Sequence, residues 1–109
     1  MLKDILYKVS IKSVYGNTGI DVIDLQTDSR KVSAGTCFIA LVGTAVDGHN
    51  FIDTAIGNGA VAIVCEKMPA DVKDHVTYIE VDNSAAAAGY MSHNFYGEPS
   101  SKMKLVGVT

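Results

Sequence analysis

Residues 27–66 read TDSRKVSAGTCFIALVGTAVDGHNFIDTAIGNGAVAIVCE, and this stretch decides the fold. A polar turn at 27–30 enters an apolar run at 36–42, which ends in a glycine-bearing loop. A short segment with helical spacing then leads to a second apolar run at 61–65. Apolar runs bounded by turn residues are typical of strands covered on both faces. The stretch therefore predicts two buried strands joined by a helix.

The flanking sequence extends this pattern in both directions. Residues 1–8 have the spacing of a short helix, and residues 10–15 and 20–26 alternate like two half-buried strands around the turn at 16–19. We expect those two strands to pair as an N-terminal hairpin at one edge of the sheet. Further expected elements are a helix over 51–58 capped by Asn50 and stopped by Gly57 and Gly59, a strand at 76–81, a helix over 85–96 capped by 82–84, and a strand beginning at 103–108.

Strands that alternate with helices predict an α/β domain. We expect a single mixed, mainly parallel sheet flanked by helices, with residues 36–42 as its central strand. A chain of 109 residues is long enough for one domain with a real core. The apolar run at 105–109 suggests a chain cut at a domain boundary.

Composition excludes several classes of protein. Hydrophobic residues make up 48% and charged residues 19% of the chain, which argues against disorder. The net charge is −3 and the lysines are scattered, so we expect no nucleic-acid partner. No apolar run approaches the ~18 residues of a membrane span, and the first residues do not form a secretory signal. We expect a soluble cytoplasmic protein without membrane insertion, in which Cys37 and Cys65 are buried reduced thiols.

The polar turn at Thr27-Asp28-Ser29-Arg30 is the first candidate site. Its side chains suit a turn that grips a substrate, but they also suit a strand-ending turn in which Asp28 or Ser29 caps local amides. Arg30 is the only arginine in the chain. It could bind a phosphate, order Asp28, or form a surface ion pair of little effect. This turn and the loop at 43–49 bracket one apolar run, so we expect them to share a cleft.

The loop at 43–49 is the second candidate site. It follows a buried strand, where open α/β sheets place ligand loops, but it lacks the Gly-x-Gly-x-x-Gly spacing. It could cradle an anion or a pyrimidine edge, or it could be a plain connection. Asp47 and His49 have no neighbouring nucleophile, so capping or loop fixing suits them better than acid–base chemistry. We assign no catalytic residue and no metal ligand.

Several motifs together resemble the amino-terminal domain of the Mur ligases, and among them the ligases that add the third residue of the peptidoglycan stem peptide. The resemblance covers most of the chain from Thr27 onward. It rests on Thr27-Asp28-Ser29-Arg30, on Gly35-x-x-Phe38-x-Ala40-x-x-Gly43, on Asp47-Gly48-His49-x-Phe51-Ile52-x-x-Ala55-Ile56-x-x-Gly59-Ala60-x-Ala62 with Glu66, on Phe95-Tyr96-x-x-Pro99-Ser100, and on Leu105-Val106-Gly107-Val108-Thr109.

The resemblance implies a role for each site residue. The domain would hold the UDP end of a UDP-N-acetylmuramoyl dipeptide, with Thr27 and Ser29 contacting the uridine diphosphate. Residues Thr44, Ala45 and Val46 would line the uracil and diphosphate pocket, mainly through backbone amides. Asp28, Arg30, Asp47, Gly48 and His49 would shape the loops or contact phosphate.

The implied reaction is ATP-dependent amide formation on the D-glutamate side chain. Residues 1–109 would be the UDP-substrate-binding domain, truncated before the ATP-binding central domain, so ATP and Mg²⁺ would act elsewhere in the full-length enzyme. The fragment itself would bind substrate without a cofactor and without catalysing. The added amine, meso-diaminopimelate or lysine, stays open. The alternatives are a stand-alone nucleotide-sensing or protein-interaction module and, less favourably, a hydrolase that uses Cys37 or Cys65.

Overall fold

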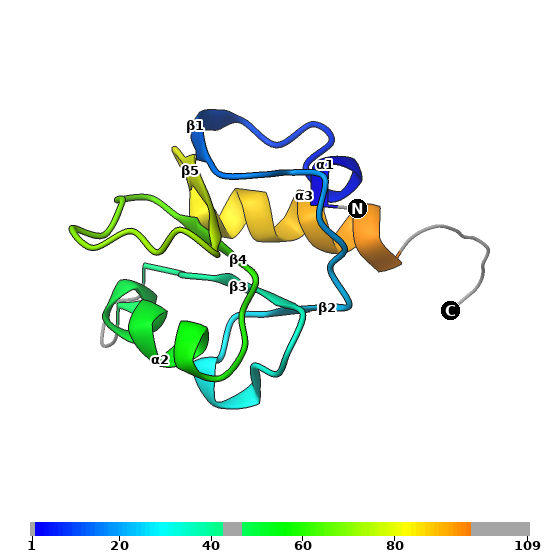
Figure 1. Ribbon diagram of the computed structural model, residues 1–109. Coiled ribbons are helices and arrows are strands. Elements are labelled where there is room, and N and C mark those ends of the chain that lie inside the picture. The colour runs from blue at the N-terminus through cyan, green and yellow to red at the C-terminus, as the bar shows by residue number, and fades with distance from the viewer. Residues whose placement is uncertain (1, 43–46, 97–109) are drawn as a thin grey trace.

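A computed structural model describes residues 2–42 and 47–96 of the chain. Its centre is one five-stranded sheet in the order β1-β5-β4-β3-β2 (Figure 1). The strands are β1 (Ile11–Tyr15), β2 (Asp24–Gln26), β3 (Thr36–Ile39), β4 (Ala62–Cys65) and β5 (Thr77–Val81), and the helices are α1 (Leu2–Ile5), α2 (Ile52–Gly57), α3 (Ser84–Tyr96) and the 3₁₀ turns η1 (Ser29–Lys31) and η2 (Gly48–Phe51). Strands β2 to β5 are parallel and β1 is antiparallel to β5. The predicted mixed, mainly parallel sheet is confirmed.

Helices cover both faces of the sheet, so alternate residues of each inner strand enter different cores. One face packs against α1 and α3 through Cys37, Ile39, Ala62, Val64, Ile79 and Val81. The other packs against α2 through Phe38, Ile63, Cys65 and Tyr78. Every residue of β3 and β4 is buried, which explains their nearly continuous apolar sequence.

The strand predicted to be central, β3, lies one place away from the centre of the sheet and is shorter than expected. Strand β3 ends at Ile39 and lies second from the β2 edge, and β4 is the middle strand. The Ala40 amide still donates to the Val64 carbonyl at 2.8 Å, which extends the pairing by one residue. Val42 then turns out of the sheet, with 57% of its surface exposed, and bridges to Asp47. A run of apolar residues indicates that a segment is buried, but it does not show where the backbone hydrogen bonds between strands end.

The predicted N-terminal hairpin is wrong. Strands β1 and β2 lie at opposite edges of the sheet, where β1 pairs with β5 and β2 pairs with β3. Between them, Ile20 and Val22 pack against the core under α1, and the Leu2 amide donates to the Ile20 carbonyl at 2.8 Å. The segment therefore crosses the end of the sheet and forms a strand only from Asp24. Alternating residues indicate a half-buried strand without identifying its partner.

The helix after β3 begins differently from the prediction. Asp47, and not Asn50, supplies the cap: its side chain accepts from the His49 amide and starts η2, which runs directly into α2. The predicted stop is confirmed at Gly59, which has a φ of +114°. Asn58, the C-cap residue of α2, donates through Nδ2 to the Ser29 carbonyl at 2.9 Å. The helix end is thus tied to the candidate turn.

Helix α3 follows the prediction closely. The Asn83 side chain accepts from the Ala86 amide at 3.0 Å, as expected of the cap region. Asn94 donates through Nδ2 to the carbonyls of Ile5 and Tyr7, which binds α3 to α1. The Tyr96 hydroxyl donates to Asp24 Oδ1 at 3.0 Å and ties the helix end to β2. The strand expected at 103–108 lies outside the described residues.

Candidate functional site

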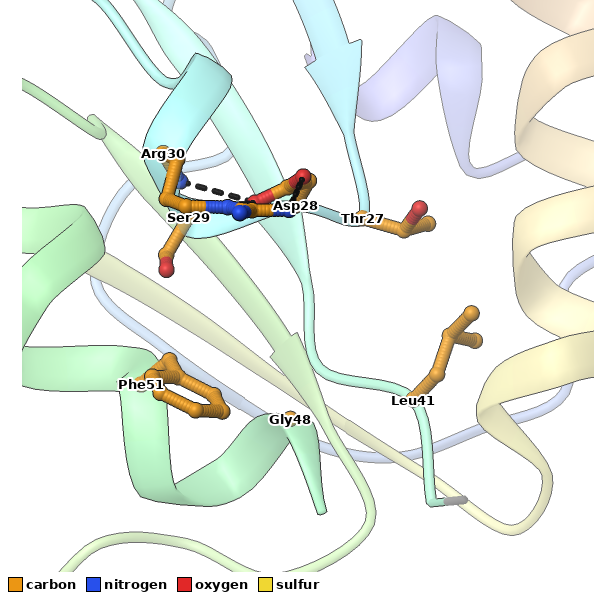
Figure 2. Close-up of a pocket in the computed structure, with 7 residues that line it drawn as sticks. All are labelled: Thr27, Asp28, Ser29, Arg30, Leu41, Gly48 and Phe51. Atoms are coloured by element: carbon orange, nitrogen blue, oxygen red, sulfur yellow. Dashed lines mark hydrogen bonds and ion pairs between the residues drawn. The ribbon is translucent and has the colours of Figure 1, made fainter. Parts of the chain in front are cut away.

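A cleft of about 660 Å³ opens beyond the carboxyl ends of β2 and β3. Because these neighbouring strands are parallel, the segments that follow them emerge at the same edge of the sheet. The cleft is lined by Thr27, Asp28, Ser29, Arg30, Leu41, Gly48 and Phe51 (Figure 2). The polar turn and the loop after β3 therefore meet at one hollow, where α/β sheets usually bind ligands.

Asp28 and Arg30 form a closed pair on the rim of the cleft. Asp28 Oδ1 accepts from the Arg30 amide at 3.0 Å and from Nε at 3.1 Å, and Oδ2 accepts from Nη2 at 2.9 Å. The side-chain hydrogen bonds from Arg30 hold the pKa of Asp28 at about 2, below its usual 3.8. The Arg30 side chain is 87% exposed. Arg30 thus orders Asp28, one of the roles that the sequence left open, while most of its side chain faces solvent.

Ser29 is the buried polar residue of the cleft, with only 5% of its surface exposed. Its backbone carbonyl accepts from Asn58, which holds the turn against α2. Its hydroxyl points toward the space between the turn and Phe51, and no described residue forms a hydrogen bond with it (Figure 2). Because this hydroxyl faces the open cleft, a polar ligand atom there can form a hydrogen bond with it.

The remaining walls are mainly apolar and come from three separate segments. Thr27 is exposed at the end of β2, Leu41 is half-buried after β3, and Phe51 is 39% exposed at the end of η2. A flat apolar wall opposite a hydroxyl suits a planar ring with polar edges. Sequence reasoning missed Leu41 and Phe51 as site residues. The only signal was their position beside the two candidate segments.

Gly48 brings the loop after β3 against the end of that strand. Its amide donates to the Leu41 carbonyl at 2.7 Å. A Cβ built at Gly48 would lie 2.7 Å from the Leu41 nitrogen and 2.9 Å from the Leu41 oxygen. Because both are backbone atoms, neither can move aside without moving the strand end. Glycine at this position therefore lets the start of η2 pack directly against the backbone of Leu41.

Asp47 and His49 connect the loop to the neighbouring strand. Asp47 Oδ1 accepts from the His49 amide at 2.9 Å and lies 2.7 Å from His49 Nδ1. The backbone hydrogen bond from His49 is the main cause of the lowered pKa of Asp47. His49 Nε2 accepts from the amides of Glu66 at 2.9 Å and Lys67 at 3.3 Å. Both residues thus fasten this side of the cleft to the end of β4.

Glu66 is one of the residues on which the family resemblance rests, but the sequence indicated no role for it. Its Oε2 accepts from the Ser84 amide at 2.8 Å and from the Ser84 hydroxyl at 2.9 Å, at the start of α3. The backbone hydrogen bond from Ser84 is the main cause of its lowered pKa. The ends of β3 and β4 and the start of α3 are therefore linked.

Three residues that were predicted to line the pocket, Thr44, Ala45 and Val46, lie outside the described residues.

The two cysteines of the chain both lie buried in strands. Burial raises the pKa of Cys37 to about 12 and that of Cys65 to about 11, so both thiols are protonated and shielded. Within residues 2–42 and 47–96 no three His, Cys, Asp or Glu side chains gather as a metal site. In the same part of the chain no helix has the length and apolar character needed to cross a bilayer.

Comparison with known proteins identifies relatives over the whole sequence. The family model described as "Mur ligase family, catalytic domain" matches residues 22–96. Proteins named UDP-N-acetylmuramoyl-L-alanyl-D-glutamate–2,6-diaminopimelate ligase from Cytophaga hutchinsonii and Bacteroides fragilis are 50% and 45% identical, each over 99% of this chain. A third protein of that name, from Clostridium tetani, is 39% identical over 99% of the chain. The chain spans only 22% to 23% of the length of these curated relatives.

Solved structures of ligases share the fold of this chain. The UDP-N-acetylmuramoylalanyl-D-glutamyl-2,6-diaminopimelate–D-alanyl-D-alanyl ligase of Acinetobacter baumannii matches 67% of this chain and 16% of its own, with a TM-score of 0.57 and 26% identity. The MurF ligase of Thermotoga maritima, solved in complex with ADP, matches 64% of this chain and 16% of its own, with a TM-score of 0.56 and 31% identity. With a family model across residues 22–96 and relatives up to 50% identical, the chain belongs to the Mur ligase family.

Proposed function

We propose that this chain binds the UDP moiety of UDP-N-acetylmuramoyl-L-alanyl-D-glutamate. It does so as the amino-terminal part of an ATP-dependent ligase that adds the third amino acid of the peptidoglycan stem peptide. The names of the relatives support the substrate and favour 2,6-diaminopimelate as the added amine. No residue of this chain is assigned to the amine.

The observation that carries the proposal is the Ser29 hydroxyl, which is buried, faces the cleft and has no partner among the described residues. A uracil edge or a phosphate oxygen can satisfy it. Phe51 and Leu41 supply an apolar wall for the pyrimidine ring, and Thr27 supplies a second hydroxyl at the rim. We also assign to this pocket the amides of Thr44, Ala45 and Val46, which lie outside the described residues.

Arg30 lines the cleft with a largely exposed side chain. Its guanidinium already orders Asp28, so a phosphate would have to share the donors that Asp28 uses or bind the exposed side of the group. We therefore assign Arg30 to shaping the turn, with a screened attraction for the diphosphate as its second contribution.

ATP and Mg²⁺ do not fit the part of the chain described above. The full sequence of 109 residues contains no Gly-x-x-x-x-Gly-Lys-Ser/Thr loop, and the described residues gather no metal site. The proposal therefore places both in other parts of the ligase, and this chain contributes substrate binding and no chemical step.

Calorimetric titration with UDP tests the proposal through Ser29→Ala. Losing one neutral hydrogen bond costs about 0.5–1.5 kcal/mol, so the dissociation constant should rise about two- to thirteenfold. Ser13→Ala is the matched control, because Ser13 is exposed on β1 at the opposite edge of the sheet. Equal affinities for wild type and Ser29→Ala, or no binding of UDP at all, would show that the site is misassigned.

A further inference from the structure

A second hollow, of about 500 Å³, lies between the end of α1 and the exposed face of α3, and we call it the α1–α3 hollow. Its walls come from the two residues after Leu6 and from one face of the helix, namely Tyr7, Lys8, Ala86, Gly89, Tyr90 and His93. It shares no lining residue with the cleft beyond β2 and β3. The hollow is therefore a separate feature of the fold.

Hydrogen bonds within the protein hold the two walls together. Asn94 on α3 donates through Nδ2 to the Ile5 carbonyl at 2.8 Å and to the Tyr7 carbonyl at 2.6 Å. The Val9 amide closes the turn after α1 by donating to the Leu6 carbonyl at 3.0 Å. The shape of the hollow is thus set by backbone contacts that need no ligand.

Lys8 breaks a local rule of chain geometry at this hollow. Its φ is +69°, and no other non-glycine residue of the described chain has a positive φ. A left-handed residue after a helix is usually glycine or asparagine, because a Cβ is strained there. Lysine at this position accepts that strain and puts an ammonium at the wall of the hollow.

Gly89 breaks the complementary rule on the opposite wall. It lies in the interior of the 13-residue helix α3, where alanine would be more stable than glycine. A Cβ built there meets no described atom within 4 Å, so packing does not require glycine. Glycine instead leaves the floor of the hollow open. Local rules are broken most often at functional sites, and here two departures meet in one hollow.

The chemistry of the walls indicates the ligand. Tyr7 and Tyr90 are 66% and 48% exposed, so both can offer aromatic surface to a ring. Lys8 Nζ lies 5.7 Å from the centroid of the Tyr7 ring. Within residues 2–42 and 47–96 no carboxylate lies at ion-pair distance from this ammonium. The walls therefore combine aromatic surface, an open floor and an unneutralised positive charge.

We propose that the α1–α3 hollow binds a small aromatic carboxylate, with the ring against Tyr90 and the open floor at Gly89 and the carboxylate on Lys8. The volume lies within the range of about 300–1,000 Å³ that is usual for small-molecule sites. A protein partner would need about 20–30 residues on each side, far more than this short strip of helix and one turn supply. The inference does not depend on UDP binding.

Titration of the chain with 2-naphthoate, followed by nuclear magnetic resonance, tests the proposal. The amide signals of Gly89 and Tyr90 should shift and saturate with a dissociation constant of about 1 mM, as expected for a ligand of this size. The amide signals of Gly48 and Phe51, which line the other cleft, should stay in place. The uncharged analogue 2-naphthamide should bind more weakly than 2-naphthoate.

Lys8→Gln tests the charge while keeping a side chain of similar length. It should weaken 2-naphthoate binding about two- to fivefold, as expected for an exposed ion pair, and the loss should shrink at high salt. It should leave 2-naphthamide binding unchanged. Lys31→Gln is the matched control, because Lys31 is exposed on η1 and does not line the hollow.

Gly89→Leu tests the open floor without disturbing the core. Leucine favours a helix and has free space at this position, so Tm should not fall while 2-naphthoate binding is lost. Equal binding of 2-naphthoate and 2-naphthamide, or 2-naphthoate affinity that survives both Lys8→Gln and Gly89→Leu, would overturn the inference. So would saturating shifts at Gly48 and Phe51 with none at Gly89 and Tyr90.

Discussion

Replacing Gly59 with alanine should destabilise the chain strongly, because two independent costs meet at this residue. Its φ of +114° lies in the region that L side chains rarely adopt, which costs about 1–2 kcal/mol. A Cβ there would also lie 2.7 Å from both the nitrogen and the Cα of Ala34. Overpacking of this kind costs about 1–3 kcal/mol. The two costs together predict a loss of about 2–5 kcal/mol of unfolding free energy.

Gly57 provides a matched control two residues away. A Cβ at Gly57 meets nothing within 4 Å, and the residue is the last of α2, so alanine should stabilise the chain by about 0.5–1 kcal/mol. The same substitution thus has opposite signs at neighbouring glycines of one helix end. Because about 1 kcal/mol shifts Tm by about 4–8 °C in domains near this size, the two variants should separate clearly.

Urea unfolding followed by circular dichroism measures both variants against wild type. The m-value should not change, so the difference appears in the midpoint. The damage should concentrate where Ala34 precedes β3, since the Gly35 amide donates to the Gly59 carbonyl at 3.1 Å. The reasoning is refuted if Gly59→Ala unfolds at the wild-type midpoint, or if Gly57→Ala is destabilised as much as Gly59→Ala.

Two further predictions follow from the cleft and its surroundings. The pKa of Asp28 is about 2 in the folded chain, below its usual 3.8, so the stability that its carboxylate contributes should be fully present above about pH 4 and lost as the pH falls through about 2. Asp28→Asn should therefore be less stable than wild type in urea at neutral pH. A difference in stability between the two proteins that stays unchanged down to about pH 2 would contradict this. The purified wild-type chain should release no phosphate from ATP, with or without Mg²⁺ and UDP, because its sequence holds no phosphate-binding loop. ATP hydrolysis that copurifies with the chain through successive columns would disprove its assignment as a substrate-binding domain.

Burial and turn chemistry could be predicted because both are local properties of the sequence. The apolar runs at 36–42 and 61–65 marked the two strands with every residue buried, and the polar turn at 27–30 fell at the cleft. The pairing of β1 and β2 could not be predicted in this way. Alternation along each strand is satisfied by any partner, and the partner depends on the strand order of the whole sheet, in which β2 and β1 lie at opposite edges beside β3 and β5.

The parts of the site that escaped prediction depend on contacts between distant residues. Asn58 holds Ser29 across 29 positions of sequence, and the Glu66 amide reaches His49 across 17. Each residue looks locally like a helix end, a loop or a strand end. The sequence did favour capping or loop fixing for Asp47 and His49, and Asp47 caps η2, but the cap of the following helix was wrongly assigned to Asn50.

Strand β1 has a consequence for how this chain behaves at high concentration. All five of its residues are exposed on an outer edge that no described strand covers, and three of them, Ile11, Val14 and Tyr15, are apolar. Such an edge could template another chain. However, its register against β5 shifts between Ile11 and Ser13, at the position of Lys12. An irregular edge with a charge at its bulge offers no even row of donors and acceptors to a second strand. The irregularity therefore disfavours edge-to-edge aggregation on the side of the sheet opposite the cleft.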